Sequence, residues 1–328
     1  MEKSDLKIVF MGTPEFAVEA LKALVEHDYR VVAVVTQPDK PVGRHGSVLQ
    51  PSAVKQYALG QGIPVLQPVK MKDPAFVEKL RSFGGNLQVV VAFRMLPEVV
   101  WAMPKFGTFN VHAALLPQYR GAAPINWAVI NGEKRTGVTT FFLDHDIDTG
   151  RIIMQLPYDI ADDADAEAVY DGLMHLGSDI CLKTLERILD SDGHPATVTQ
   201  EEWADGNGPL RAAPKLFKET CQIDWDQPQK KIYDFVRGLS PHPGAWTTLV
   251  SPEGKETVLK VYQTAKTVQG TEGRKPGTLV VEAKKLLVCT ADGMLELKAV
   301  QLAGKKRMAA GDFVNGMKNL DQMFLKFV

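Results

Sequence analysis

Short, continuously apolar runs alternate with segments of helical periodicity in the first half of the chain. The most hydrophobic run, residues 87–93, is predicted to be a strand that is buried on both faces. Between the runs, apolar side chains recur at spacings of three and four, as they do over residues 16–24. This alternation is typical of a parallel sheet with helices on both faces. We therefore expect an α/β domain with a Rossmann-like, doubly wound, mostly parallel sheet. The predicted strands are residues 6–11, 30–36, 63–66, 87–93, 109–112 and 137–143, and the predicted helices include 51–60, 123–131 and 162–189.

The pattern changes after about residue 210. Residues 191–209 are polar and rich in Gly and Asp, which indicates a linker. Beyond them, one short helix (230–239) accompanies several short β-like runs with turn signals between them. Such runs favour a small barrel or sandwich, with an OB-like barrel as our candidate. We predict a catalytic domain at 1–190, a linker at 191–210 and a smaller OB-like domain at 211–328.

Composition excludes several classes of protein. Hydrophobic residues make up 45% and charged residues 23% of the 328 residues, as in globular enzymes. No apolar run approaches the ~18 residues of a membrane helix, and the charged N-terminus leads directly into a predicted strand. The three cysteines lie far apart and form neither a disulfide framework nor a metal spacing. We expect a cytoplasmic protein that does not associate with membranes.

Charge is distributed unevenly along the chain. Residues 1–210 carry 19 Lys and Arg against 27 Asp and Glu, a net charge of −8. Residues 211–328 carry 19 against 12, a net charge of +7, and the two sum to the overall −1. A basic second half suggests an anionic partner such as nucleic acid. Ordinary solvated lysines explain the same numbers equally well.

Common cofactor and nucleophile motifs do not occur. The first predicted strand is followed by Gly12-Thr13-Pro14 rather than by G-x-G-x-x-G, which weighs against a nicotinamide enzyme. The sequence contains no P-loop, no G-x-S-x-G elbow and no H-E-x-x-H. The chemistry must therefore be sought elsewhere.

One predicted strand carries two polar side chains of catalytic character. Asn110 and His112 are two residues apart, so their side chains point to the same face of the strand. The strand ends in a turn rich in Pro and Gly, and open α/β sheets bind ligands at the carboxyl ends of strands. An amide and an imidazole there can stabilise a developing oxyanion and move protons. From the spacing alone, a structural Asn beside a satisfied His is the more common explanation.

A second cluster follows another predicted strand, residues 137–143. Asp144, Asp146 and Asp148 lie in one loop, which we expect at the same kind of strand end as the turn after His112. A carboxylate there could orient a histidine or accept a proton. Aspartates also form turns, which is the structural explanation. The spacing does not continue into an EF-hand loop, and we expect no metal.

These two clusters resemble those of folate-dependent formyltransferases. The resemblance rests on Asn-x-His at 110–112, on Leu-Leu-Pro-x-x-Arg-Gly-Ala-Ala-Pro at 115–124, and on Asp-Thr-Gly at 148–150. It extends over residues 12–17, 36–44 and 239–246, and so covers nearly the whole chain. The chain departs from the usual family pattern at two places: Ala114 stands where a Ser is usual, and Phe93-Arg94-Met95 lacks the usual Tyr-Gly turn.

The resemblance implies formyl transfer from 10-formyltetrahydrofolate as co-substrate. It implies that Asn110 holds the formyl oxygen and that His112 stabilises the tetrahedral intermediate and assists proton transfer. Asp148 would orient His112 and help to deprotonate the amine, with Asp144 and Asp146 as alternatives. The folate-contacting residues that it implies are Phe93, Arg94, Ala114, Leu115, Leu116 and Pro117.

The resemblance is closest to family members that formylate the methionine esterified to initiator tRNA, which would give the chain a role in translation initiation. The long polar loop 37–50 and the basic second half support such a partner. The expected tRNA-contacting residues are Lys40, Arg44, His45, Lys305, Lys306 and Arg307. The alternatives are a formyltransferase acting on a 4-amino-sugar nucleotide and a non-catalytic module that binds nucleic acid. We expect a monomer.

Overall fold

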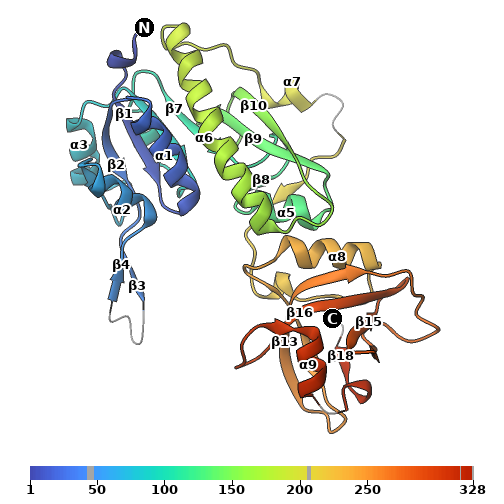
Figure 1. The fold of residues 1–328 in the computed structure, drawn as a ribbon. Coiled ribbons are helices and arrows are strands. Elements are labelled where there is room, and N and C mark those ends of the chain that lie inside the picture. Colours follow the sequence, from blue (N-terminus) through green and yellow to red (C-terminus); the bar gives the residue numbers. More distant parts are fainter. Residues whose placement is uncertain (43–47, 205–207, 318, 327–328) are drawn as a thin grey trace. The chain divides into compact units, whose positions relative to one another are not determined.

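The computed structural model describes residues 1–42, 48–204, 208–317 and 319–326 (Figure 1). The chain divides into two compact units. The N-terminal unit comprises Met1–Gly121, Arg135–Asp159 and Tyr170–Ala212, and the C-terminal unit comprises Ala122–Lys134, Ile160–Val169 and Ala213–Val328. Residues 191–204, within the predicted linker, therefore cluster with the N-terminal unit.

A seven-stranded sheet forms the centre of the N-terminal unit, with strand order β10-β9-β7-β6-β1-β2-β5. The five strands from β5 to β7 are parallel, whereas β9 is antiparallel to β7 and β10 is antiparallel to β9. β1 and β6 are buried over all five residues, as the continuous apolar runs predict. The strands are β1 (Ile8–Gly12), β2 (Val31–Val35), β5 (Val65–Leu66), β6 (Leu87–Val91), β7 (Thr108–His112), β9 (Arg135–Phe142) and β10 (Ile152–Asp159).

Helices cover both faces of this sheet (Figure 1). On one face, α1 lies next to α6, where the rings of Phe16 and Tyr170 meet edge to face at 5.3 Å. On the other face, α3 and α4 pack on Val9, Met11 and Val90. The doubly wound, mostly parallel fold is thereby confirmed. The helices of this part of the chain are α1 (Glu15–Glu26), α2 (Ala53–Gly60), α3 (Pro74–Ser82), α4 (Glu98–Trp101), α6 (Ala166–Asp190) and α7 (Gln200–Ala204).

Several short elements accompany this sheet and its helices. A short 3-10 helix, η1 (Lys3–Asp5), precedes β1. Two small two-stranded sheets stand apart from the main one: a hairpin of β3 (Lys40–Val42) and β4 (Val48–Gln50), and the pair β8 (Arg120–Gly121) and β11 (Ala212–Ala213).

The C-terminal unit contains a strongly curved antiparallel sheet in the order β14-β15-β16-β13-β12-β18. Its two ends approach each other, because Leu325 N donates to Gly277 O at 2.8 Å and Thr278 bridges Phe324. The sheet is therefore a nearly closed barrel, and the expected small barrel is confirmed. Its elements are α5 (Pro124–Ile130), η3 (Glu219–Cys221), α8 (Gln229–Gly238), β12 (Ala245–Val250), β13 (Glu256–Lys266), β14 (Leu279–Glu282), β15 (Lys285–Cys289), β16 (Met294–Leu302), β17 (Met308–Ala309), α9 (Ala310–Gly316), η4 (Leu320–Gln322) and β18 (Phe324–Lys326).

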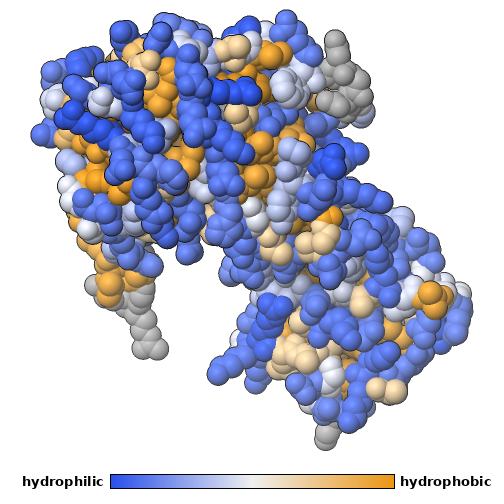
Figure 2. Space-filling view, turned by 45° about the horizontal axis from the view of Figure 1, so that its top comes forward, coloured by the Kyte–Doolittle hydropathy of each residue, from blue (hydrophilic) through white to orange (hydrophobic). Residues whose placement is uncertain are grey.

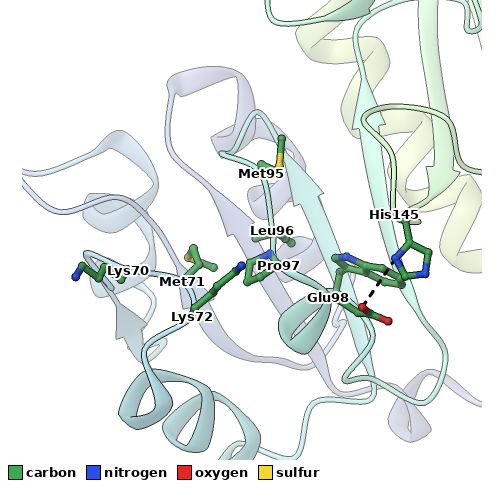
Figure 3. A pocket seen from close by; sticks show the side chains of 9 residues that line it. Lys70, Met71, Lys72, Met95, Leu96, Pro97, Glu98 and His145 are labelled. Carbon is green, nitrogen blue, oxygen red and sulfur yellow. Dashed lines mark ion pairs between the residues drawn. The ribbon is translucent and has the colours of Figure 1, made fainter.

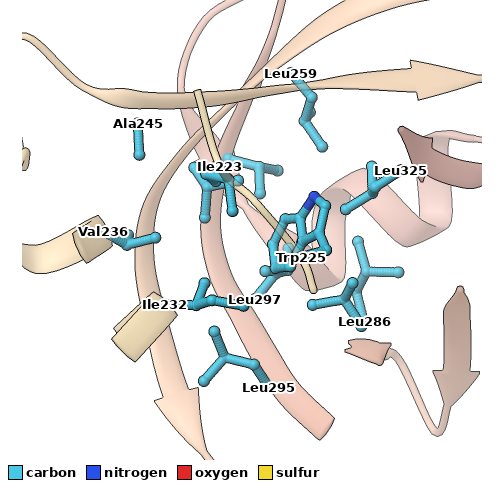
Figure 4. Close-up of a cluster of buried hydrophobic side chains, with 14 of the residues drawn as sticks. Ile223, Trp225, Ile232, Val236, Ala245, Leu259, Leu286, Leu295, Leu297 and Leu325 are labelled. Atoms are coloured by element: carbon cyan, nitrogen blue, oxygen red, sulfur yellow. The ribbon is translucent and has the colours of Figure 1, made fainter. Parts of the chain in front are cut away.

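Trp225 forms the centre of the barrel core (Figure 4). Its side chain is fully buried, and its indole N–H donates to Thr247 Oγ1 at 2.9 Å. Aliphatic side chains from the strands and from α8 surround it, among them Leu259, Leu297 and Val236. Because a buried indole needs both apolar neighbours and an acceptor, these contacts fix how the barrel closes around it.

None of the helices in the described part of the chain combines the length and the apolar character that crossing a bilayer requires.

The three cysteines are buried, and we expect them to be unreactive in the native protein. Burial raises the pKa of the Cys181 thiol to about 12 and also raises the pKa values of Cys221 and Cys289. Because the thiolate is the reactive species, a disulfide reagent at pH 8 should modify none of them within minutes. In denaturant, all three should react. Rapid reaction of one native thiol would contradict this burial.

Candidate active site

Strand β7 presents Asn110 and His112 on the same face of the sheet. Val111, between them, points toward α6, where a Cβ placed on Gly177 would lie 3.7 Å from its Cγ1. Asn110 and His112 therefore face the opposite side, as the two-residue spacing predicts. Asn110 is half-buried, and within the described residues its side-chain amide makes no hydrogen bond to protein. A half-buried amide in this state is available to a ligand.

The imidazole of His112 lies between two oxygen atoms. Its side chain is only 6% exposed, Nε2 is 2.9 Å from the carbonyl oxygen of Tyr119, and Nδ1 is 3.9 Å from Oδ2 of Asp148. Because a carbonyl oxygen can only accept, Nε2 donates a hydrogen bond to it. Nδ1 then faces a carboxylate at ion-pair distance, so a proton received at Nδ1 would be stabilised there.

Asp148 reaches His112 by a path that the strand pattern does not predict. Because β9 is antiparallel to β7, its carboxyl end lies beside the amino end of β7, where Phe142 pairs with Phe109. We expected these aspartates at the edge of the sheet where the parallel strands have their carboxyl ends, and this expectation is wrong. Instead, the loop between β9 and β10 returns across the sheet, and Asp148 adopts a left-handed conformation (φ 56°). Its Oδ2 also accepts a hydrogen bond from Gly121 N at 3.0 Å.

The other two aspartates of this loop have different surroundings. Asp144 Oδ1 accepts hydrogen bonds from Asp146 N at 3.2 Å and from Thr149 Oγ1 at 2.8 Å, so Asp144 shapes the turn. Both Asp144 and Asp146 are exposed. Among the three aspartates, Asp148 is the one placed beside His112.

The segment 114–117 follows β7 and lies largely inside the protein. Ala114, Leu116 and Pro117 are buried, whereas Leu115 is half-buried. Thr139 on β9 fixes the segment, because its hydroxyl donates to Ala114 O at 2.6 Å and accepts from Leu116 N at 3.1 Å. A ligand could therefore meet this segment through Leu115 and the backbone, and not through three apolar side chains.

Arg94 ties together two loops at the carboxyl ends of β5 and β6. Its guanidinium donates to the carbonyl oxygens of Pro68 and Val69 and lies 5.6 Å from the ring centroid of Phe93. Burial lowers the pKa of Arg94. These bonds give Arg94 a structural role in the loop, and Phe93 beside it is half-buried.

A pocket of about 490 Å³ opens beside this loop (Figure 3). Its walls include Met71, Leu96 and Trp101, and Lys70 and Lys72 lie at its edge. His145 lines it too, in ion-pair contact with Glu98 at 3.9 Å. The volume suits a drug-sized ligand, and the loop that carries His145 also carries Asp148.

The residues expected to contact tRNA lie on two surfaces. Lys40 belongs to the hairpin of β3 and β4, whereas Arg44 and His45 lie outside the described residues. Lys305, Lys306 and Arg307 are exposed on the loop between β16 and β17 of the C-terminal unit. The guanidinium of Arg307 lies 4.5 Å from the ring centroid of Tyr262.

The hairpin also exposes apolar side chains, visible beside its tip in Figure 2. Val48 is 58% exposed and Leu49 is 65% exposed. At its base, the Lys55 ammonium and the Gln67 amide bind the carboxylate of Asp39 and hold its pKa below the usual value. An anchored hairpin with exposed apolar and basic side chains is suited to contact a partner.

Sequence patterns did not assign a role to several residues that bond to His112, to Asp148 or to the segment 114–117. They are Tyr119, Gly121, Thr139, Gln155 and Gln200. Only Gln200 has a local signal, because Thr199 and Glu202 have the Thr-x-x-Glu spacing of a capping box at the start of α7.

Comparisons with known proteins match two parts of the chain to protein families. Residues 6–185 match the formyl transferase family, and residues 215–318 match the family described as formyl transferase, C-terminal domain. A methionyl-tRNA formyltransferase of Parabacteroides distasonis is 59% identical to this chain over 98% of each. A methionyl-tRNA formyltransferase of Bacteroides thetaiotaomicron is 55% identical, also over 98% of each.

Among solved structures, WlaRD, a sugar 3N-formyl transferase crystallised with dTDP and 5-N-formyl-THF, is similar in fold. Its TM-score is 0.63 at 18% identity, with 92% of this chain and 99% of that chain covered. At this identity the likeness shows the fold alone.

Proposed function

This chain belongs to the formyl transferase family, and we propose that it transfers a formyl group from 10-formyltetrahydrofolate to the α-amine of methionine on charged initiator tRNA. The observation that carries the chemistry is the convergence of Asn110, His112 and Asp148 at one end of β7. The observation that carries the acceptor is the identity of 59% over nearly the full length. The activity would serve translation initiation in the cytoplasm.

Each residue of this trio has a distinct role in the proposal. The free amide of Asn110 donates a hydrogen bond to the formyl oxygen as negative charge develops on it. Protonated at Nδ1, His112 adds positive charge to the same site, and the carboxylate of Asp148 stabilises that proton. An α-amine titrates near pH ~7.7–8.0, so a neutral nucleophile exists at physiological pH without covalent catalysis. The amine loses one proton, the formyl carbon moves to its nitrogen, and the folate nitrogen leaves with a proton.

The folate donor supplies the formyl group, and two segments would border it. They are the loop after β6 with Phe93 and Arg94, and the segment that contains Ala114, Leu115, Leu116 and Pro117. The unbonded amide of Asn110 supports a ligand beside the second segment, and the pocket lined by Met95 and Leu96 supports one beside the first. Because Leu116 and Pro117 are buried, their share of the contact would come from the backbone.

The names of the relatives favour methionyl-tRNA over a sugar nucleotide as the acceptor. Relatives named methionyl-tRNA formyltransferase reach 59% identity, whereas the sugar formyl transferase of similar fold is 18% identical. We propose that the segment 37–50, which contains Lys40, Arg44 and His45, contacts the acceptor end. The exposed loop with Lys305, Lys306 and Arg307 would contact phosphates. Residues 1–190 would act as the catalytic domain and 211–328 as the tRNA-binding domain of a monomer.

A panel of acceptors tests this proposal. With 10-formyltetrahydrofolate as donor, we expect charged initiator tRNA to be formylated with a kcat/KM at least about 100-fold above that of charged elongator tRNA, through differential contacts in the transition state. A 4-amino-sugar nucleotide should give no product. Formylated methionine is measured after the ester is hydrolysed. A higher kcat/KM for the sugar nucleotide than for charged tRNA would contradict the proposed acceptor, but it would not contradict formyl transfer.

A further inference from the structure

Gln200 connects the two segments that enclose His112. Its side chain is 1% exposed, and its Nε2 donates to the carbonyl oxygens of Asp148 at 2.8 Å and Gly150 at 2.9 Å. Its Oε1 accepts from Arg120, at 2.9 Å from Nε and 2.6 Å from Nη2. Every hydrogen-bonding group of the Gln200 amide is therefore used within the site.

The two segments joined in this way both contact the catalytic histidine. Tyr119, next to Arg120, provides the carbonyl oxygen for His112 Nε2, and Asp148 provides the carboxylate for Nδ1. Gly121, on the other side of Arg120, donates to that carboxylate. A shift of Gln200 would therefore change the separation of the two groups between which the imidazole lies.

The segments that contain Tyr119 and Asp148 need stabilising contacts from elsewhere in the chain, because their backbones are strained. Tyr119 (φ 61°) and Asp148 (φ 56°) both occupy the left-handed region, which is unfavourable for residues other than glycine. Such conformations persist only where surrounding contacts determine them. The bonds of Gln200 end directly at Asp148 and one residue from Tyr119.

The position of Gln200 is itself fixed on both sides. Before it, Val198 and Ile152 exchange backbone hydrogen bonds of 2.8 and 3.0 Å and attach the segment to β10. After it, Glu202 accepts from Thr199 N and Oγ1, which closes the first turn of α7. Gln200 therefore belongs to a rigid support rather than to a free linker.

We propose that Gln200 is a positioning residue that fixes the Asp148 carboxylate beside His112. This inference rests on the proposed formyl transfer. It predicts that Gln200→Glu lowers kcat by about 10- to 100-fold, by analogy with the hydrogen-bonding partners that orient metal-ligating side chains. The new carboxylate keeps its contact with Arg120 but faces two carbonyl oxygens to which it cannot donate. KM for both substrates should stay within about twofold, because Gln200 is buried and does not face them.

A double-mutant cycle with Asp148→Asn separates positioning from general damage. If Gln200 acts through Asp148, Gln200→Glu should lower kcat less than about threefold further in the Asp148→Asn background. Gln200→Met, which has a similar size and no charge, should show the same non-additivity. Gln61→Glu, the same chemical change at an exposed site after α2, serves as control and should leave kcat within about twofold.

The outcomes distinguish this inference from the function on which it rests. Unchanged kcat in Asp148→Asn would overturn the role of Asp148 and the proposed mechanism with it. A large loss in Asp148→Asn, combined with unchanged kcat in both Gln200 variants or with effects that multiply in the double variants, would overturn only the positioning role. Thermal unfolding of each variant shows whether it is folded at the assay temperature.

Discussion

Replacing His112 by glutamine should lower kcat for formyl transfer by about 10²- to 10⁴-fold, the usual contribution of a positioned acid or base. Glutamine can still donate to the Tyr119 carbonyl oxygen, but it cannot take up a proton opposite Asp148. Asn110→Ala should cost about 10²- to 10³-fold, because it removes a donor to the developing oxyanion. Single-turnover formylation of charged initiator tRNA measures both effects on the chemical step.

The affinity for tRNA decides whether these residues are catalytic. Both variants should bind charged tRNA within about twofold of the native protein, since the proposed tRNA contacts lie on the hairpin and on the loop between β16 and β17. A loss of tRNA affinity equal to the loss of turnover would favour a module that only binds nucleic acid. Lys306→Ala is a control with the opposite expected result. It should weaken tRNA binding and reduce the salt dependence of the tRNA affinity, without lowering kcat.

The parts of the fold that depend on local pattern follow from the sequence. A run such as Leu87–Val91 is apolar at every position except Gln88, and only the centre of a helix-covered sheet buries both faces of a strand. The direction of β9 has no such local sign, because an antiparallel strand inside a mixed sheet can carry the same residues as a parallel one. Because β9 is antiparallel to β7, the loop with Asp148 does not begin at the strand end that we expected. Asp148 nevertheless lies beside His112, because of the course of this loop.

In the candidate site too, the sequence predicts what depends on local spacing and does not predict contacts between distant segments. Asn110 and His112 share a face because they share a strand, so two residues of spacing suffice to predict it. Gln200 reaches Asp148 across 52 positions and Arg120 across 80, and no periodicity reports contacts of that span. Burial of Leu116 in a core cluster with Phe141 and Ile152 is equally a tertiary fact, which a resemblance in sequence does not reveal.

The second large effect that we expect concerns the stability of the C-terminal unit. Asp234 on α8 is 4% exposed. Its Oδ1 accepts a hydrogen bond from Arg237 Nε at 2.8 Å and lies at ion-pair distance, also 2.8 Å, from Nη2. Arg237 is itself 7% exposed, and its other nitrogen donates to Ala164 O at 2.7 Å. Asp234→Ala would leave a buried guanidinium without its counter-charge, which costs about 3–5 kcal/mol.

Removing both charges should cost less than removing one. Asp234→Leu combined with Arg237→Met eliminates the unpaired charge and keeps apolar volume, so we expect it to recover most of the loss in Asp234→Ala. Hydrogen exchange of the α8 and β13 amides measures the stability of this unit by itself, since a chain of two units need not unfold in one step. Asp226→Ala, at an exposed position before α8, should change it by less than about 0.5 kcal/mol. If Asp234→Ala also costs less than about 1 kcal/mol, the pair is solvated in solution and contributes little to the stability of this unit.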